Sequence, residues 1–340
     1  MLRLPRFQLR RPSSLDEALA YLAEAGPGGR VIAGGTDLLP NMKHELLTPA
    51  VVVSLSAIGE LAGIRRESDG GLVIGAMTTI ASVAASSEVR QSAPALAQAA
   101  SLVASPQIRR VGTIGGNILL DTRCQWYNQT YFWRSAIGYC LKKDGAVCHV
   151  VAGGSRCVAA ASSDTAPALM TLGASVQIAG VAGRREVALD QFWTSDGARH
   201  HHLAEGEILT AVRIPATGAG HRGAYGKLRD RGAIDFPLLG VAARLDVGTD
   251  GLIRRSDLVL TTLAAAPRRV SAAAALLAGG RPGTSEFHQR VIAAAEAAFR
   301  QCHPLENISG DTVWRRDMIR VYVGRTLAAA ANGGGPVHHL

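Results

Sequence analysis

The sequence predicts an α+β protein of two or three domains, and three observations support this. Short apolar stretches of strand length are interspersed with amphipathic helical stretches along the chain. The length of 340 residues exceeds the size at which a single hydrophobic core stops growing. Pro215, followed by a Gly-rich run, marks a domain boundary near residues 216–223.

The composition is that of an ordinary globular protein. Hydrophobic residues make up 47% of the chain, charged residues 19%, and mean hydropathy is +0.13. No apolar run approaches the roughly 18 residues of a membrane span, and the first residues lack the apolar core of a signal peptide. We therefore expect a cytoplasmic protein without a membrane segment.

The net charge of +9 raises the question of nucleic-acid binding. The arginines are spread along the chain in ones and twos, and no helix-turn-helix or RNP-like string accompanies them. We therefore expect no nucleic-acid partner.

The N-terminal half begins with a helix that has clear end signals. Ser14 and Glu17 form a capping box, and Gly26 is suited to a left-handed stop. The strands expected next span residues 30–33, 51–55 and 72–76, followed by helices at 79–85 and 93–104.

The C-terminal half continues the mixed pattern. The helices expected here span residues 163–172, 271–278, 286–299 and 314–331, and the strands span 175–179, 185–189, 208–214, 223–229, 240–247 and 257–265. In the last helix one apolar face is expected, formed by Ile319, Tyr322, Val323, Thr326 and Leu327. We expect the tail, residues 333–340, to fray.

Two glycine-rich loops, at residues 31–41 and 111–117, are the first candidate binding elements. Paired glycines let backbone N–H groups approach a ligand and form the concave nests that hold pyrophosphate. Thr36, Asp37, Thr113 and Asn117 would add side-chain hydrogen bonds. One such loop is explained by a turn alone, but two favour a dinucleotide site, and the absence of GxGxxG or GxxxxGK[ST] indicates another fold than Rossmann or P-loop.

Four of the five cysteines form the second candidate site, with the spacing C-x15-C-x7-C-x8-C. Thiols of a cytosolic chain stay reduced, so ligation is favoured over disulfides. Four buried small hydrophobes and a structural zinc site are the alternatives. The spacing has neither the close cysteine pairs of zinc ribbons nor the bacterial ferredoxin pattern, so it indicates a metal site without naming the metal.

The surroundings of these cysteines are rich in aromatic and basic residues. Six of the chain's 16 aromatic side chains lie between the first two cysteines and are expected to shield the site from water: Trp126, Tyr127, Tyr131, Phe132, Trp133 and Tyr139. Arg134, Lys142, Lys143 and Arg156 would offset negative charge on a thiolate cluster. The alternative is a small hydrophobic core with a basic rim.

Several motifs together carry a family resemblance that runs through nearly the whole chain. AGGTDL, TIGGN, SDTAPALMTLGA, KLRDRGAIDFPLLGVAA at 227–243 and TTLAAAPRR at 261–269 resemble the flavoprotein family of xanthine and carbon monoxide dehydrogenases, the molybdenum hydroxylases. The resemblance implies a bipartite FAD-binding fold of the vanillyl-alcohol-oxidase (PCMH) type, in subdomains 1–56 and 57–217. A CO dehydrogenase flavoprotein-like α+β domain, 218–332, would follow.

The same resemblance implies which residues bind FAD, and it implies no catalytic residue. The residues implied are Val31, Ile32, Ala33, Gly34, Gly35, Thr36, Asp37, Leu38, Thr113, Gly115, Gly116, Asn117, Asp164 and Lys227. Taken alone, Asp164 and Lys227 are also explained by a helix cap or a salt bridge.

The cysteine segment narrows the resemblance further. DTRC, YNQ, WRS, GYCLK and CHV look like the insertion of the 4-hydroxybenzoyl-CoA reductase flavoprotein subunits, which carries a [4Fe-4S] cluster. The insertion would span about residues 122–158, with Cys124, Cys140, Cys148 and Cys157 as ligands, and Cys302 would be a buried thiol.

The function implied is electron transfer within a larger enzyme. A large molybdopterin subunit and a small subunit with [2Fe-2S] clusters would be the partners, and the whole enzyme would dehydroxylate an aromatic acyl-CoA reductively. A ferredoxin would be the electron donor, docked on Lys142 and Lys143. The alternatives are the FAD subunit of an oxidative molybdenum hydroxylase and a zinc-stapled binding protein without a redox role.

Overall fold

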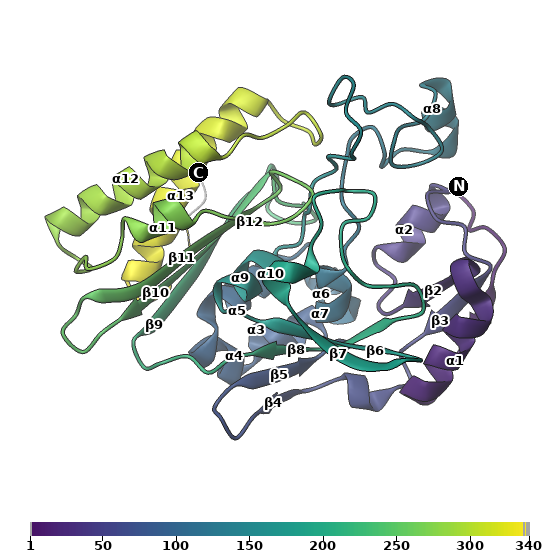
Figure 1. Ribbon diagram of the computed structural model, residues 1–340, viewed down its shortest axis with the longest axis horizontal. Helices are drawn as coiled ribbons and strands as arrows, with labels where there is room; N and C mark the ends of the chain where they lie inside the picture. Colours follow the sequence, from purple (N-terminus) through teal and green to yellow (C-terminus); the bar gives the residue numbers. More distant parts are fainter. Residues whose placement is uncertain (1, 336, 338–340) are drawn as a thin grey trace.

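The computed structural model describes residues 2–335 and 337, and its strands form three sheets (Figure 1). The N-terminal sheet is parallel, in the order β1-β3-β2. Its elements are β1 (Gln8–Arg10), α1 (Leu15–Ala25), β2 (Gly29–Ile32), α2 (Leu38–Lys43) and β3 (Val51–Ser54).

Helix α1 has the expected end signals. Ser14 Oγ accepts a hydrogen bond from the backbone N–H of Glu17 at 3.2 Å, and the Glu17 carboxylate accepts one from the Ser13 N–H at 2.8 Å. Gly26 ends the helix with φ of +52°. The helix packs its buried apolar face against the parallel sheet. Its C-terminal end is followed by β2, which leads into the first glycine loop.

The second unit has a five-stranded sheet in the order β4-β5-β8-β6-β7, with all described pairings antiparallel. Its strands are β4 (Ile64–Arg66), β5 (Leu72–Gly75), β6 (Ser175–Gly180), β7 (Gly183–Ala188) and β8 (Ile208–Ile214). Its helices are α3 (Ile80–Ala85), α4 (Ser87–Ser92), α5 (Pro94–Leu102), α6 (Pro106–Val111), α7 (Ile114–Ile118), α9 (Thr165–Thr171) and α10 (Leu189–Phe192).

The C-terminal unit is a four-stranded antiparallel sheet in the order β12-β11-β10-β9, with helices on one face. Its elements are β9 (His221–Leu228), β10 (Leu239–Val247), β11 (Ile253–Thr261), β12 (Arg268–Arg269), α11 (Ser271–Ala275), α12 (Ser285–Gln301) and α13 (Thr312–Ala331). Helices α11 and α13 pack on this sheet, while α5 and α9 of the second unit contact it as well. The hydrophobic core of the second unit therefore continues into the third.

The cysteine segment projects beyond the three sheets and carries α8 (Tyr131–Ala136), which Figure 1 shows above α2. Arg134 ties it to the N-terminal unit, because its guanidinium, only 1% exposed, donates to the carbonyl oxygens of His44 and Glu45. Asn307 ties it to the C-terminal unit. Its backbone carbonyl accepts a hydrogen bond from the Gln125 N–H at 2.7 Å, and its side-chain amide donates one to the Val158 carbonyl at 2.6 Å.

Most long elements lie close to their predicted positions, including β8 and the buried face of α13. Several short elements were not predicted from the sequence, namely β1, α2, β4, α4, α6, α7, α8, α10 and β12, and β11 begins four residues before the predicted strand. In the tail, Val337 is buried against the C-terminal core, contrary to the expected fraying, and residues 336 and 338–340 lie outside the described part. No helix among the described residues is long and apolar enough to cross a membrane.

Candidate functional site

A cleft of about 870 Å³ opens where the three units meet. Both glycine loops line it, together with the segment 198–209 and the loop 234–236. The volume lies in the upper part of the range of cofactor sites, which suits a ligand as large as a dinucleotide.

The two loops touch each other at Gly34. A Cβ atom on Gly34 would lie 1.9 Å from the carbonyl oxygen of Val111, so only glycine permits this contact. The next residue, Gly35, has φ of +72°, a left-handed conformation that side chains rarely adopt. One glycine thus joins the two loops and the other turns the backbone along the cleft wall.

The second loop is held by local hydrogen bonds. Thr113 caps α7, because its hydroxyl accepts from the Gly116 N–H at 3.1 Å. Gly115 packs on Ala76, where an added Cβ would lie 2.8 Å from the alanine Cβ. Asn117 Oδ1 accepts hydrogen bonds from Ser163 Oγ and from both the N–H and the hydroxyl of Thr165. These bonds orient the Asn117 amide at the cleft.

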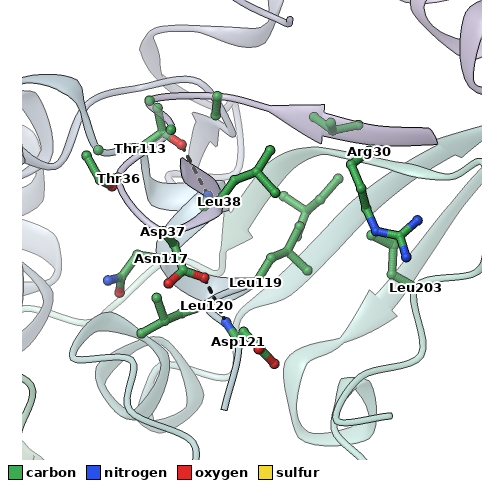
Figure 2. Close-up of a pocket in the computed structure, with 18 of the residues that line it drawn as sticks. Arg30, Thr36, Asp37, Leu38, Thr113, Asn117, Leu119, Leu120, Asp121 and Leu203 are labelled. Atoms are coloured by element: carbon green, nitrogen blue, oxygen red, sulfur yellow. Dashed lines mark hydrogen bonds between the residues drawn. The ribbon is translucent and has the colours of Figure 1, made fainter. Parts of the chain in front are cut away.

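All the residues predicted to bind FAD line this cleft except Ile32 and Lys227. Figure 2 shows Thr36, Asp37 and Leu38 of the first loop facing Thr113 and Asn117 of the second. Loops more than 70 residues apart in the sequence are thus brought to one wall.

Asp37 is engaged by the protein rather than directed at the cleft alone. Its carboxylate forms a salt bridge with Arg123 and accepts from the Asp121 N–H at 3.4 Å, the bond drawn in Figure 2. Burial lowers the pKa of Arg123 to about 10, so the guanidinium remains charged at neutral pH. Asp37 therefore connects the first glycine loop to the base of the cysteine segment.

Asp164 and Lys227 form a buried ion pair at 2.9 Å, with Asp164 on the cleft wall and Lys227 behind it. Lys227 is 0% exposed and also donates to the carbonyl oxygens of Leu102 and Asp235. Asp164 accepts a second hydrogen bond from the Tyr225 hydroxyl at 2.8 Å. Burial raises the pKa of Asp164, while Lys227 and Tyr225 oppose that rise.

The segment 198–209 was missed by the sequence analysis, because it carries no glycine pair or other loop motif. His200 stands out within it. Its ring is buried, and Nε2 has no hydrogen-bond partner among the described residues. Burial lowers the pKa of His200 to about 3, so the ring is neutral. His200 therefore adds a neutral, buried ring to the cleft wall.

The four clustered cysteines form a second site. Cys124, Cys140, Cys148 and Cys157 line one small cavity, although they come from segments up to 33 residues apart. Burial raises the pKa of the Cys124 thiol to about 11, and the other three cysteines add to the rise. Cys302 is buried in the C-terminal core, as predicted.

No group of three or more His, Cys, Asp or Glu side chains in the described part of the chain is arranged to hold a metal ion. The donor set nevertheless fits an iron–sulfur cluster chemically, since four thiols face one cavity and a cluster spreads its thiolates over separate iron atoms.

The surroundings of the cysteines differ from the prediction in two ways. Only Trp126 and Tyr127 of the six aromatic residues line the cavity, whereas Phe132 is 82% exposed, so the expected six-ring shield is wrong. Two of the four basic residues, Arg134 and Lys142, are also internal. Lys142 is only 6% exposed and bound to Asp121 at 2.7 Å, so it is not available to dock a ferredoxin.

Family comparisons agree with this geometry. Residues 5–217 match the family described as the FAD binding domain in molybdopterin dehydrogenase, and residues 223–330 match the CO dehydrogenase flavoprotein C-terminal domain. The two matches meet at the boundary between the second and third units.

Individual relatives point the same way. The carbon monoxide dehydrogenase medium chain of Hydrogenophaga pseudoflava is 32% identical over 96% of this chain and 97% of its own. An aldehyde oxidoreductase FAD-binding subunit of Escherichia coli K12 is 34% identical over 81% of this chain and 86% of its own. A structure of the H. pseudoflava carbon monoxide dehydrogenase has a TM-score of 0.79 at 31% identity, covering 98% of this chain and all of the other.

The predicted FAD-binding fold with a CO dehydrogenase flavoprotein-like C-terminal domain is therefore confirmed. The relatives are oxidoreductase subunits, so the chain is one part of a larger enzyme and does not complete the reaction alone. The family match supports FAD as a cofactor of this chain. This chain belongs to the FAD-binding subunits of the molybdenum hydroxylase family.

Proposed function

We propose that this chain carries both FAD and a [4Fe-4S] cluster and transfers electrons within a molybdenum hydroxylase-type enzyme of the 4-hydroxybenzoyl-CoA reductase kind. The observation that supports the proposal is the convergence of Cys124, Cys140, Cys148 and Cys157 on one cavity. The fit of cysteine spacing and motifs to that kind of enzyme, DTRC and GYCLK among them, adds to it.

The residues present suit both groups. The two glycine loops and Asp164 would hold the FAD, and the four cysteines would hold the cluster. A cluster supplies one-electron chemistry beside a flavin that accepts one or two electrons. The protein keeps three of the four cysteines from solvent, since Cys124, Cys140 and Cys157 are buried in one cluster with Tyr127, against which Trp126 packs.

The partners proposed are a large molybdopterin subunit and a small [2Fe-2S] subunit. The names of the relatives, medium chains and FAD-binding subunits, support an assembly of several subunits. A ferredoxin is the proposed donor and an aromatic acyl-CoA the proposed substrate, bound elsewhere in the assembly. Because Lys142 is buried, a docking surface on this segment would use Lys143 and Arg156 instead.

A second candidate is the FAD subunit of an oxidative molybdenum hydroxylase without a cluster on this chain. The end-to-end match to carbon monoxide dehydrogenase medium chains favours it. In that case the cysteines form a small buried core, or hold zinc as a structural staple.

The test is an absorption spectrum of anaerobically purified protein, with iron, sulfide, zinc and released FAD measured on the same sample. We expect about four iron atoms per FAD. Cys148→Ala should lose the iron and keep the FAD, whereas Cys302→Ala, the matched control in the C-terminal core, should keep both. FAD without iron would favour the second candidate, and zinc would identify a staple.

A further inference from the structure

The flavin cleft and the cysteine cavity share a wall. Tyr127 and Lys142 line both of them. The chain also links them directly, because Asp121 lines the cleft and Cys124, three residues later, lines the cavity. A charge in this wall is therefore close to both sites.

Lys142 is held there by several contacts. Its ammonium donates to Asp121 Oδ1 at 2.7 Å, to Thr122 Oγ1 at 2.6 Å and to the Thr122 carbonyl at 2.9 Å. It also lies 4.2 Å from the centre of the Tyr127 ring. Tyr127 completes the group, because its hydroxyl donates to the other Asp121 oxygen at 2.9 Å.

The charge of Lys142 acts on both sides of the wall. On the cysteine side, Lys142 lines the same cavity as Cys140 and Cys157. On the cleft side, Asp121 balances the ammonium and is itself only 19% exposed. Interactions between buried charges are weakly screened, so removing either partner exposes both sites to the charge of the other.

We propose that the Lys142–Asp121 ion pair is a shared electrostatic element that tunes both cofactor sites together. The inference rests on the proposed function, since it needs a redox group bound by the cysteines. FAD is an anion and a thiolate-bound cluster becomes more negative on reduction, so both sites respond to this pair with the same sign.

The test is a charge cycle of three variants in the full chain. Lys142→Met leaves Asp121 unpaired and should weaken FAD binding about tenfold. It should also lower the cluster midpoint potential by about 59 mV, which is a tenfold change in the equilibrium constant of a one-electron couple. Asp121→Asn should move both quantities the opposite way. The double variant, which is neutral like the wild-type pair, should restore both.

The readouts are the FAD dissociation constant of deflavinated protein and a redox titration followed by electron paramagnetic resonance. Lys43→Met is the matched control, because Lys43 is exposed on α2 and lines neither site. Thermal melting identifies a variant that fails to fold, in which case Asp121→Asn carries the test.

The outcomes separate the two proposals. Wild-type protein with FAD but no iron overturns the cluster and, with it, the coupling. Wild-type protein with both groups keeps the proposed function. The coupling then fails if the single variants change only one of the two quantities, FAD affinity or cluster potential, or neither. It also fails if the double variant stays as perturbed as Lys142→Met.

Discussion

At the residue scale, two neighbouring glycines of one motif are required for different physical reasons. Gly34 is required because the Val111 backbone occupies the place of a side chain, and Gly35 because φ is +72°. Neither reason is the close approach of a ligand that the motif first suggested. The loop pair is therefore a packing unit whose shape also forms the cleft wall.

Replacing Gly34 by alanine should separate the two loops. The added Cβ overlaps the Val111 carbonyl, and overpacking of this kind costs about 1–3 kcal/mol of unfolding free energy. We expect a loss of that size in chemical denaturation and weaker FAD binding in fluorescence titration. Gly59→Ala is the control, since nothing lies within 4 Å of its Cβ position. Wild-type affinity in Gly34→Ala would contradict the assigned contact.

Buried cations are the second lesson at this scale. Lys142, Lys227 and Arg134 contribute to the positive net charge, yet the first two form buried ion pairs and the third holds a backbone turn. These three cations therefore fix internal geometry and do not contribute to a charged surface.

At the element scale, the β9–β10 register places His221 opposite Asp246. His221 Nδ1 lies 2.9 Å from Asp246 Oδ1. Arg244, on the same strand as Asp246, donates a hydrogen bond to Asp246 Oδ2 at 2.7 Å. Burial alone would raise the pKa of Asp246, but the bonds from His221 and Arg244 outweigh it and lower the pKa to about 2.

This shift predicts acid sensitivity of the C-terminal sheet. The folded-state pKa of about 2 lies below the ordinary value of 3.8, so the stabilisation is present above that value and is lost as the pH falls toward 2. After solvent screening we expect a loss of about 1–2 kcal/mol. The measurement is urea unfolding at pH 6 and pH 3.

Two variants check the assignment. Asp246→Asn should be less stable than wild type at pH 6 and should show a smaller fall at pH 3. The carboxylate of Asp250 pairs with the exposed Arg254, so Asp250→Asn should show the same fall in unfolding free energy at pH 3 as the wild type. Equal pH dependence in both variants would exclude Asp246 as the source.

At the scale of the whole molecule, the cysteine segment bridges two units that are distant in sequence. Arg134 holds the turn after α2, and Asn307 holds both ends of the segment from the C-terminal unit. The cleft and the cysteine cavity are therefore positioned by contacts from all three units.

Asn307→Leu should loosen the segment. The change leaves the part-buried Val158 carbonyl without this donor, which costs about 1 kcal/mol. We expect faster limited proteolysis within residues 122–158 and no faster cleavage of the three sheets. Glu306→Gln is the control, because the residue contacts Gln125 through its carbonyl and not its side chain. Unchanged cleavage in Asn307→Leu would mean that other contacts hold the segment.

The sequence by itself determined the long elements and drew attention to the two glycine loops that line the cleft. Local signals were sufficient for these, such as the Ser14 cap, the apolar face of α13 and the paired glycines. Short elements such as β1 and α7 carry too few residues for a periodic pattern. They form beside other elements of the same unit, since β1 pairs with β3 and α7 contacts α9.

Only the tertiary structure decided which charges and rings face the sites. The sequence shows Lys142 and Lys143 as one basic pair, but folding buries the first against Asp121 and leaves the second half-buried beside Asp144. His200 joined the cleft without any local motif, and Phe132 was turned to solvent. Burial and charge pairing depend on contacts between segments far apart in the chain, and a local pattern does not contain them.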